Sequence, residues 1–339
     1  MEHAIMCPQC NAPLTPHRFA RSVVCSYCGT TVQLDESSLS ASIFHEAFRV
    51  WNSPGTYQIR SWVSIGNRHW ALEKFVAHGD ISDVYTARLA RWPTELAILK
   101  LLRDRQDIDL FENEWSAIQV LQKSHAPGAD TFTMLIPQPI LHGDITAGSL
   151  EGQRASIFRW ASGFHHNIDE VIQAYPQGIP PRASIWIWRR ILEVISFIHA
   201  SGMAHGAVLP ANLLIQEHEH GVRLVGYSFC GRLNEKLPSV PHGYESFYPK
   251  PAGSWSTLTP QLDITMSARC IAAILGGNPE TAALPKMVPA QLAGIIQRIA
   301  LSEPAGVAKE DAWALREELG KIAREVFGPP QFIPIVMPP

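Results

Sequence analysis

The sequence of 339 residues lacks the features that direct a protein to nucleic acid or to a membrane. Its 28 lysines and arginines are outnumbered by 31 aspartates and glutamates, so the net charge is −3 and no overall positive field attracts polyanions. It contains no run of about 18 apolar residues that could cross a bilayer. Its N-terminus also lacks the basic and then apolar pattern of a signal peptide. We therefore expect a cytoplasmic protein that does not bind membranes and for which nucleic acid is a disfavoured partner.

Cysteine is also scarce, and four of the six cysteines fall within the first 28 residues. Cys7, Cys10, Cys25 and Cys28 form two CxxC pairs separated by fourteen residues. Each pair can turn both sulfurs toward one point, and two such turns complete a tetrahedron around zinc. A redox-active CxxC pair and a chance spacing are the alternatives. About 35 residues bury too little apolar surface to fold alone, so the metal would supply the missing stability.

The residues around these cysteines resemble a zinc ribbon, which implies short strands over 19–24 and 31–34. Arg18 and Arg21 are the only lysine or arginine residues in the first 35, too few for a surface that follows a phosphate backbone. We therefore favour protein docking, or a purely structural role, over nucleic-acid binding for this segment.

A single lysine interrupts the apolar run over 95–102. Lys100 would be costly in a buried strand unless an opposite charge pairs with it. The helix predicted over 110–121 offers Glu114, which shares one helical face with Ile118. We expect a Lys100–Glu114 ion pair, which is either a structural contact or part of a binding site.

Two short motifs follow in the second half of the chain. His-Gly-Ala at 205–207 is followed five residues later by Asn212, and a predicted strand then leads to Gly-Tyr-Ser at 226–228. This order resembles the H-R-D-x-x-x-x-N and D-F-G motifs of the eukaryotic-type protein kinase family as found in bacteria. Ala207 stands in place of the catalytic base, and Gly226 in place of the aspartate that holds the bridging magnesium. The resemblance therefore implies a kinase fold without the kinase reaction, a pseudokinase.

The resemblance covers residues 57–327 and implies a nucleotide site. The loop over 77–82 matches the glycine-rich loop that closes over the phosphates, yet it keeps one glycine of three. Ile98 stands where a small alanine usually lies against adenine, so ATP is a doubtful cofactor. The amide of Asn212 could instead cap its own loop. The residues that the resemblance assigns to the nucleotide site are Gly79, Lys100, Glu114 and Asn212.

Other positions indicate whether the region over 57–327 folds stably. The usual glutamate at the end of the activation segment is absent from 248–251, and Val307 replaces its arginine partner. Losing both members of a buried ion pair can be neutral, whereas losing one leaves a costly unpaired charge. Asp263 resembles the aspartate whose carboxylate ties down the catalytic-loop backbone. These positions predict a stably folded domain.

The predicted fold is α+β and bilobal like a protein kinase, with a small β-rich N-lobe and a large helical C-lobe, preceded by a small zinc ribbon. The apolar run over 183–199 is expected to be the buried central helix of the large lobe. The expected domains are the ribbon over 1–35, a linker with a short helix over 36–56, the kinase-like domain over 57–327 and a proline-rich tail over 328–339.

Three functions are open from the sequence. We favour a catalytically inactive scaffold or allosteric regulator that acts through contacts with a protein partner, with zinc as a structural cofactor. The second is a residual ATP-binding protein with weak or atypical serine/threonine kinase activity, which Lys100, Glu114 and Asn212 support. The third is a zinc-ribbon adaptor for nucleic acid.

Overall fold

The structure is a computed structural model that divides into two compact units. The first contains Met1–Ile59 with Pro329–Pro334, and the second contains Arg60–Gly328 with Ile335–Pro339. The linker expected over 36–56, with its short helix, lies outside the described residues. The structure describes residues 5–7, 10, 12–14, 22–28, 31–33, 61–91, 93–216, 220–249, 257–302 and 311–337.

The first unit is built from two short antiparallel hairpins. Strand β1 (Ile5–Met6) pairs with β2 (Pro13–Leu14), and β3 (Ser22–Val24) pairs with β4 (Thr31–Gln33). The second hairpin confirms the two strands expected there, each somewhat shorter among the described residues. Cys7 directly follows β1 and Cys25 directly follows β3. Each hairpin therefore places the first cysteine of a CxxC pair directly after its first strand.

The second unit contains a closed six-stranded barrel in which every neighbouring pair is antiparallel. Alternate residues of a strand point to opposite faces, so Ala97, Leu99 and Leu101 fill the interior while Lys100 lies on the other face. The strands, in hydrogen-bonded order, are β10 (Arg154–Arg159), β8 (Leu96–Leu102), β7 (Ser82–Leu89), β6 (Arg68–His78), β5 (Ser61–Ile65) and β9 (Pro139–Gly148).

The strand β5 closes the barrel between β6 and β9, and the sequence did not predict it. Gly148 lies opposite Val63 with a φ of 108°, which favours glycine. A Cβ at this position would lie 2.2 Å from the carbonyl oxygen of Trp62. The close approach of β5 and β9 therefore depends on Gly148, which lies at least 83 positions after β5 in the chain.

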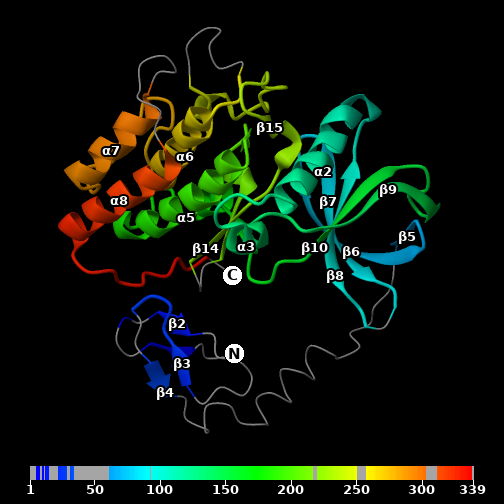
Figure 1. The fold of residues 1–339 in the computed structure, drawn as a ribbon, viewed down its shortest axis with the longest axis horizontal. Coiled ribbons are helices and arrows are strands. Elements are labelled where there is room, and N and C mark those ends of the chain that lie inside the picture. The colour runs from blue at the N-terminus through cyan, green and yellow to red at the C-terminus, as the bar shows by residue number, and fades with distance from the viewer. Residues whose placement is uncertain are drawn as a thin grey trace. The chain divides into compact units, whose positions relative to one another are not determined.

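The helices of this unit gather around α5 (Pro181–Ala200), which confirms the buried helix expected over 183–199. Twelve of its residues are buried, and the indole nitrogen of Trp188 donates to Ser267 Oγ at 3.0 Å. α5 packs against α6 (Pro260–Ile274) and α8 (Ala312–Phe327), and α7 (Ala290–Ala300) packs against both of these. Figure 1 shows the barrel strands at one end of the unit with α2 (Ile108–Gln122) alongside, and α5 to α8 at the other end.

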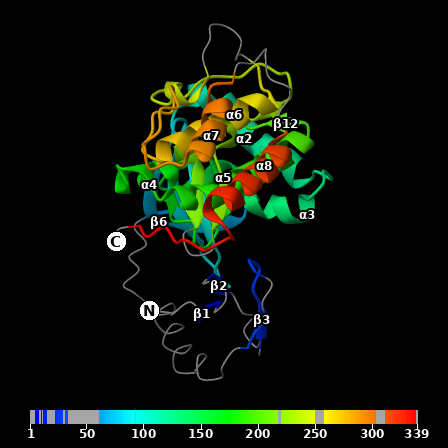
Figure 2. The ribbon, with the colours of Figure 1, turned by 90° about the vertical axis from the view of Figure 1, so that its left-hand side faces the viewer.

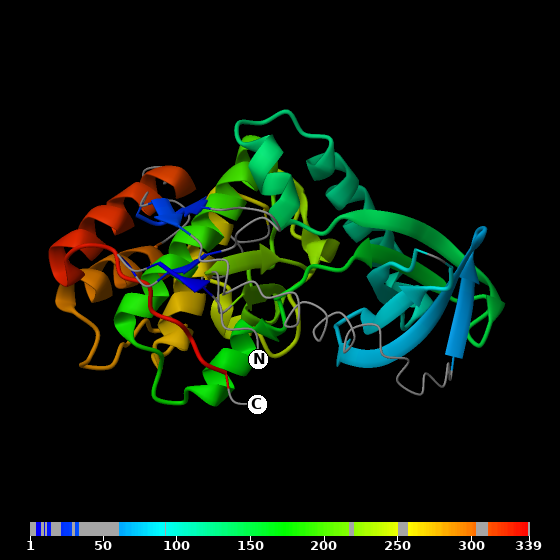
Figure 3. The ribbon, with the colours of Figure 1, turned by 90° about the horizontal axis from the view of Figure 1, so that it is seen from below.

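Figure 2 shows the second unit from its helical end, with α5 to α8 toward the viewer, and Figure 3 shows the curved barrel strands from a further side. None of the helices in the described part of the chain combines the length and the apolar character that spanning a bilayer requires. The short elements that complete the unit are η2 (Arg105–Asp107), α3 (Ala129–Phe132), η3 (Thr133–Leu135), β11 (His166–Asn167), α4 (Ile168–Ala174), β12 (Met203–Ala204), η4 (Pro210–Asn212), β13 (Leu213–Gln216), β14 (Gly221–Leu224), η5 (Tyr227–Phe229), β15 (Gly231–Arg232) and η6 (Glu245–Phe247).

Candidate functional site

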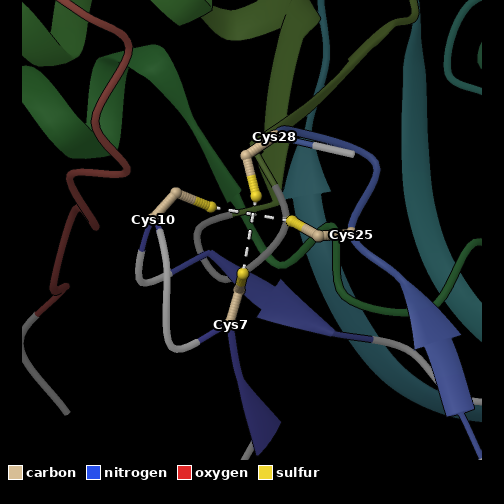
Figure 4. A group of neighbouring side chains, drawn as sticks. All are labelled: Cys7, Cys10, Cys25 and Cys28. Atoms are coloured by element: carbon tan, nitrogen blue, oxygen red, sulfur yellow. Dashed lines mark hydrogen bonds between the residues drawn. The ribbon is translucent and has the colours of Figure 1, made fainter. Parts of the chain in front are cut away.

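The four cysteines of the first unit bring their sulfur atoms to one point, as Figure 4 shows. All four sulfurs lie within 4.8 Å of one another. Two separations of 3.6 Å join Cys7 to Cys28 and Cys10 to Cys25. These pairs link one CxxC turn to the other, whereas a redox-active pair would join the two cysteines of a single turn. They are also far longer than the roughly 2.05 Å of a disulfide bond.

This geometry fits a tetrahedral metal. Zinc–thiolate bonds of about 2.3 Å place the sulfurs about 3.8 Å apart, close to the separations observed here. Burial, together with the neighbouring thiols, raises the pKa of Cys10 to about 12, so a thiolate at this position needs a cation nearby. Cys7, Cys10, Cys25 and Cys28 would hold zinc as a closed structural site, because all four coordination positions are protein sulfurs.

In the second unit, Lys100 and Glu114 form the ion pair that the sequence predicts. Lys100 Nζ lies 2.5 Å from Glu114 Oε2, and the Glu114 side chain is only 3% exposed. Its other oxygen, Oε1, accepts a hydrogen bond from the backbone amide of Tyr227 at 3.1 Å. Glu114 therefore joins β8 to the segment that follows Gly226, and both of its oxygens are used within the protein.

The neighbouring residue on α2 strengthens this connection. Asn113 Nδ2 donates to the carbonyl oxygens of Ser228 and Cys230, at 2.9 and 2.8 Å. Sequence reasoning missed Asn113, because its partners are backbone carbonyls that leave no sequence signature. Together with Glu114 it fixes α2 to η5 through three hydrogen bonds to the backbone.

The loop that matches the kinase catalytic loop is held by Asp263 of α6. The fully buried carboxylate accepts from the backbone amides of His205 and Gly206, at 2.7 and 2.8 Å, and lies 2.9 Å from His199 Nε2. Burial lowers the pKa of His205 to about 4, so this side chain is neutral at physiological pH. Ala207, at the position of the catalytic base, is completely buried and carries no group that accepts a proton.

Asn212 and Gly226 meet in a way that bears directly on metal binding. Asn212 Nδ2 donates to the backbone carbonyl of Ala207 at 3.0 Å, so the amide caps its own loop. Gly226 has a φ of 76°, and a Cβ built on it would lie 2.3 Å from Asn212 Oδ1. The Asn212 side chain therefore fills the space in which an aspartate at position 226 would begin.

The loop that matches the glycine-rich loop is a tight turn between β6 and β7. The amide of Gly79 donates to the carbonyl of Ser82 at 2.8 Å, and Arg103 donates to the carbonyl of Gly79 at 3.1 Å. Ile81 is buried and packs with Leu102 and Phe111. The described hydrogen bonds of Gly79 thus connect it to its own turn and to Arg103, and not to the Lys100–Glu114 pair or Asn212.

The stretch that matches the end of a kinase activation segment is anchored by a residue that the sequence did not reveal. Arg269, buried in α6, donates to the carbonyl oxygens of Ala300, Ser246 and Tyr248 at 2.8–3.0 Å. The Tyr248 hydroxyl in turn donates to the carbonyl of Gly206 at 2.8 Å. These bonds connect the segment to the helices without a glutamate. The other position predicted to have changed, 307, lies outside the described residues.

Comparisons with known proteins agree with both parts of this description. A family model for the zinc ribbon of the PriA DNA helicase Cys-rich region domain matches residues 7–32. The solved BubR1 kinase domain is similar over 85% of this chain and 92% of its own, with 16% identity and a TM-score of 0.57. A mutant of the Mycobacterium tuberculosis PknI kinase domain is similar over 75% of this chain and 95% of its own, with 16% identity and a TM-score of 0.53. No curated protein matches the sequence.

At this identity, the likeness to solved structures shows the fold. The chain has a kinase-like fold, and a ribbon with four clustered cysteines lies at its N-terminus.

Proposed function

We propose that this protein is a pseudokinase, a catalytically inactive kinase-like scaffold or allosteric regulator that acts in the cytoplasm through contacts with a protein partner. Its origin would be the bacterial branch of the eukaryotic-type kinase family. The observation that carries this proposal is the packing of Asn212 against Gly226, where the missing Cβ would lie 2.3 Å from Asn212 Oδ1. A kinase uses an aspartate and this asparagine to hold magnesium. Here one is absent and the other is turned onto the Ala207 carbonyl.

The connections that order the region also support a scaffold. In kinases the lysine–glutamate pair and the magnesium-binding aspartate must both be in place for phosphoryl transfer. Here Glu114, Asn113 and Asp263 join β8, α2, η5 and the loop over 205–207 through side chains of the protein alone. We therefore expect the region to keep its shape when neither nucleotide nor metal is bound.

The proposal is tested by trying to restore the reaction. We expect the wild type and the Ala207→Asp variant to transfer no radiolabelled phosphate from ATP with magnesium or manganese. Gly226→Asp should lower the melting temperature because of its contact with Asn212, and adding Asn212→Ala should recover part of that loss without activity. Autophosphorylation by the wild type would overturn the proposal.

A second candidate, residual ATP binding with weak or atypical kinase activity, is favoured by the Lys100–Glu114 pair at 2.5 Å. A second acid, Asp80, also lies within electrostatic reach of Lys100. Burial raises the pKa of Asp80, and the positive charges of Lys100 and Arg103 oppose this rise. Thermal melting with ATP or ADP, each with and without magnesium, separates the candidates. A ligand that binds only the folded state raises the midpoint, and the scaffold proposal expects no shift at millimolar nucleotide.

The third candidate, a nucleic-acid adaptor, is favoured by the name of the matched family, which belongs to a DNA helicase. A titration of labelled oligonucleotide at two salt concentrations tests it. Binding through phosphates weakens steeply with salt, whereas we expect no salt-dependent binding from a chain with a net charge of −3. For the ribbon we propose structural zinc and a role in protein docking.

A further inference from the structure

The C-terminal part of the chain contributes an aromatic residue to the core of the zinc ribbon. Phe332 belongs to the segment Pro329–Pro334, which is part of the first unit. Its half-buried ring packs against the buried cluster of Cys7, Ala12, Leu14 and Cys25. Among the described residues this small core otherwise contains aliphatic side chains and cysteines, so one phenyl ring is a large part of the apolar surface available there.

The surroundings of Phe332 include both cysteine turns. The buried cluster against which it packs contains Cys7 of the first turn and Cys25 of the second, and Tyr27 lies between the two cysteines of the second turn. The rings of Phe332 and Tyr27 meet edge to face, with centroids 5.9 Å apart and planes at 84°. This arrangement is one of the favourable geometries of an aromatic pair. The two turns are separate in the sequence, and their shared metal would hold them at the spacing that this ring bridges.

The segment that carries Phe332 has the character of a docking peptide. Pro329, Pro330 and Pro334 flank the aromatic residue, and residues 328–337 contain neither helix nor strand. Proline fixes φ near −65°, so an extended segment of this composition loses little conformational entropy when it binds. A restricted frame with one aromatic anchor suits the small apolar cluster that contains Cys7 and Cys25.

We propose that the metal-organised ribbon is a docking module whose occupant is the chain's own segment Pro329–Pro334, with Phe332 as the anchor. Four thiolates around a metal would fix the two turns, and the buried cluster that includes Cys7 and Cys25 would then offer the apolar contact for the phenyl ring. Metal binding and tail binding are therefore coupled, so each makes the other tighter. The proposal does not depend on whether the kinase-like unit is catalytic.

The first test measures the tail in the full-length protein. Chymotrypsin cleaves after exposed aromatic residues, and mass spectrometry can quantify cleavage between Phe332 and Ile333. We expect chelation of zinc to increase this cleavage at least tenfold relative to the zinc-loaded protein. Equal cleavage in both states would overturn the proposal. Tyr27→Ala should also increase cleavage, whereas Val24→Ala, which removes a ribbon side chain that is 62% exposed, should not.

The second test measures the metal. Phe332→Ala should speed the transfer of zinc to a chromogenic chelator by about tenfold, which corresponds to 1.4 kcal/mol. Val336→Ala is the matched control, because this side chain of the same tail is 70% exposed. In a double-mutant cycle, Tyr27→Ala and Phe332→Ala should be less than additive. Unchanged zinc release in Phe332→Ala, or strict additivity, would contradict the coupling.

The third test asks whose tail is bound. Protection within one chain is independent of concentration, so cleavage of the zinc-loaded protein should stay constant over a hundredfold dilution. Protection that disappears on dilution would show that the ribbon binds the tail of a second copy, and the intrachain proposal would be wrong.

Discussion

The two units of this protein keep their folds by different means. In the first, the buried apolar residues among those described are Cys7, Ala12, Leu14 and Cys25, so two candidate metal ligands are half of the core. In the second, the barrel interior and α5 bury a large apolar core from which the residues that match a kinase's chemical groups are absent. In the ribbon the core shares side chains with the candidate metal site, whereas the barrel core and α5 do not include Ala207 or Gly226, the positions that match the two catalytic aspartates of a kinase. The apolar core of that unit therefore does not require aspartates at these positions.

Removal of the metal is the sharpest way to separate the two units. Structural zinc contributes about 10–16 kcal/mol of apparent binding free energy in small modules, so we expect chelation, or Cys25→Ser, to unfold the ribbon. The kinase-like unit should keep its melting transition, because the four clustered cysteines all belong to the ribbon. Hydrogen exchange of peptides from 22–33 and from the barrel measures both outcomes.

Two results would break this comparison. The control Cys230→Ala, which changes a buried thiol of the second unit, should retain one zinc per chain by elemental analysis. Loss of zinc in that variant, or a lower melting temperature of the kinase-like unit after chelation, would show that the stability of one unit depends on the other.

The reciprocal change in the second unit is Asp263→Ala. It leaves the buried amides of His205 and Gly206 without their acceptor, and His199 without its carboxylate. Breaking a buried network of this kind costs about 3–5 kcal/mol, so we expect a loss of that size in chemical denaturation. Zinc content should stay at one per chain. Asp263→Asn keeps one acceptor oxygen and should fall between the wild type and the alanine variant.

Lowering the pH perturbs the same loop through the protonation of His205. Burial lowers the pKa of His205 to about 4, below the value of about 6.5 that an exposed histidine has, while Asp263 and Glu114 oppose the shift. Between these two values the unfolded chain binds more protons, so stability is present above pH 6.5 and is lost as the pH falls toward 4. The loss should amount to about 3 kcal/mol.

Denaturant titrations at several pH values measure this loss. In His205→Asn, whose amide oxygen can replace the ring nitrogen that accepts from Ala207, the dependence should be weaker by that amount. An unchanged pH dependence in this variant would assign the acid sensitivity to other groups.

What the sequence could predict depends on how locally each feature is encoded. The cysteine site was predictable because the spacing within and between the two CxxC pairs is typical of four sulfurs that surround one zinc ion. Lys100 and Glu114 were predictable because a charge in an apolar strand needs a partner, and helical periodicity identified it. Asp263 could be recognised from its place in the order of the motifs.

The features that the sequence did not reveal depend on backbone or on distant chain. Strand β5 closes the barrel only because Gly148 admits it. Asn113 and Arg269 act through carbonyl oxygens, which every residue possesses and which carry no pattern. The overlap between Asn212 and a Cβ at position 226 depends on the backbone angle φ of 76° at Gly226, and the sequence does not predict this angle.

The smallest expected effect concerns the connection between α2 and η5. Asn113→Ala leaves the carbonyls of Ser228 and Cys230 without their donor, which should cost about 1–3 kcal/mol. Hydrogen exchange should rise in peptides covering 226–230 while exchange in the ribbon stays unchanged. Ser116→Ala, an exposed position on the same helix, is the control and should alter neither. If nucleotide with magnesium restored protection to Asn113→Ala, the unit would still bind its kinase ligand, and the independence of its fold from that chemistry would have to be given up.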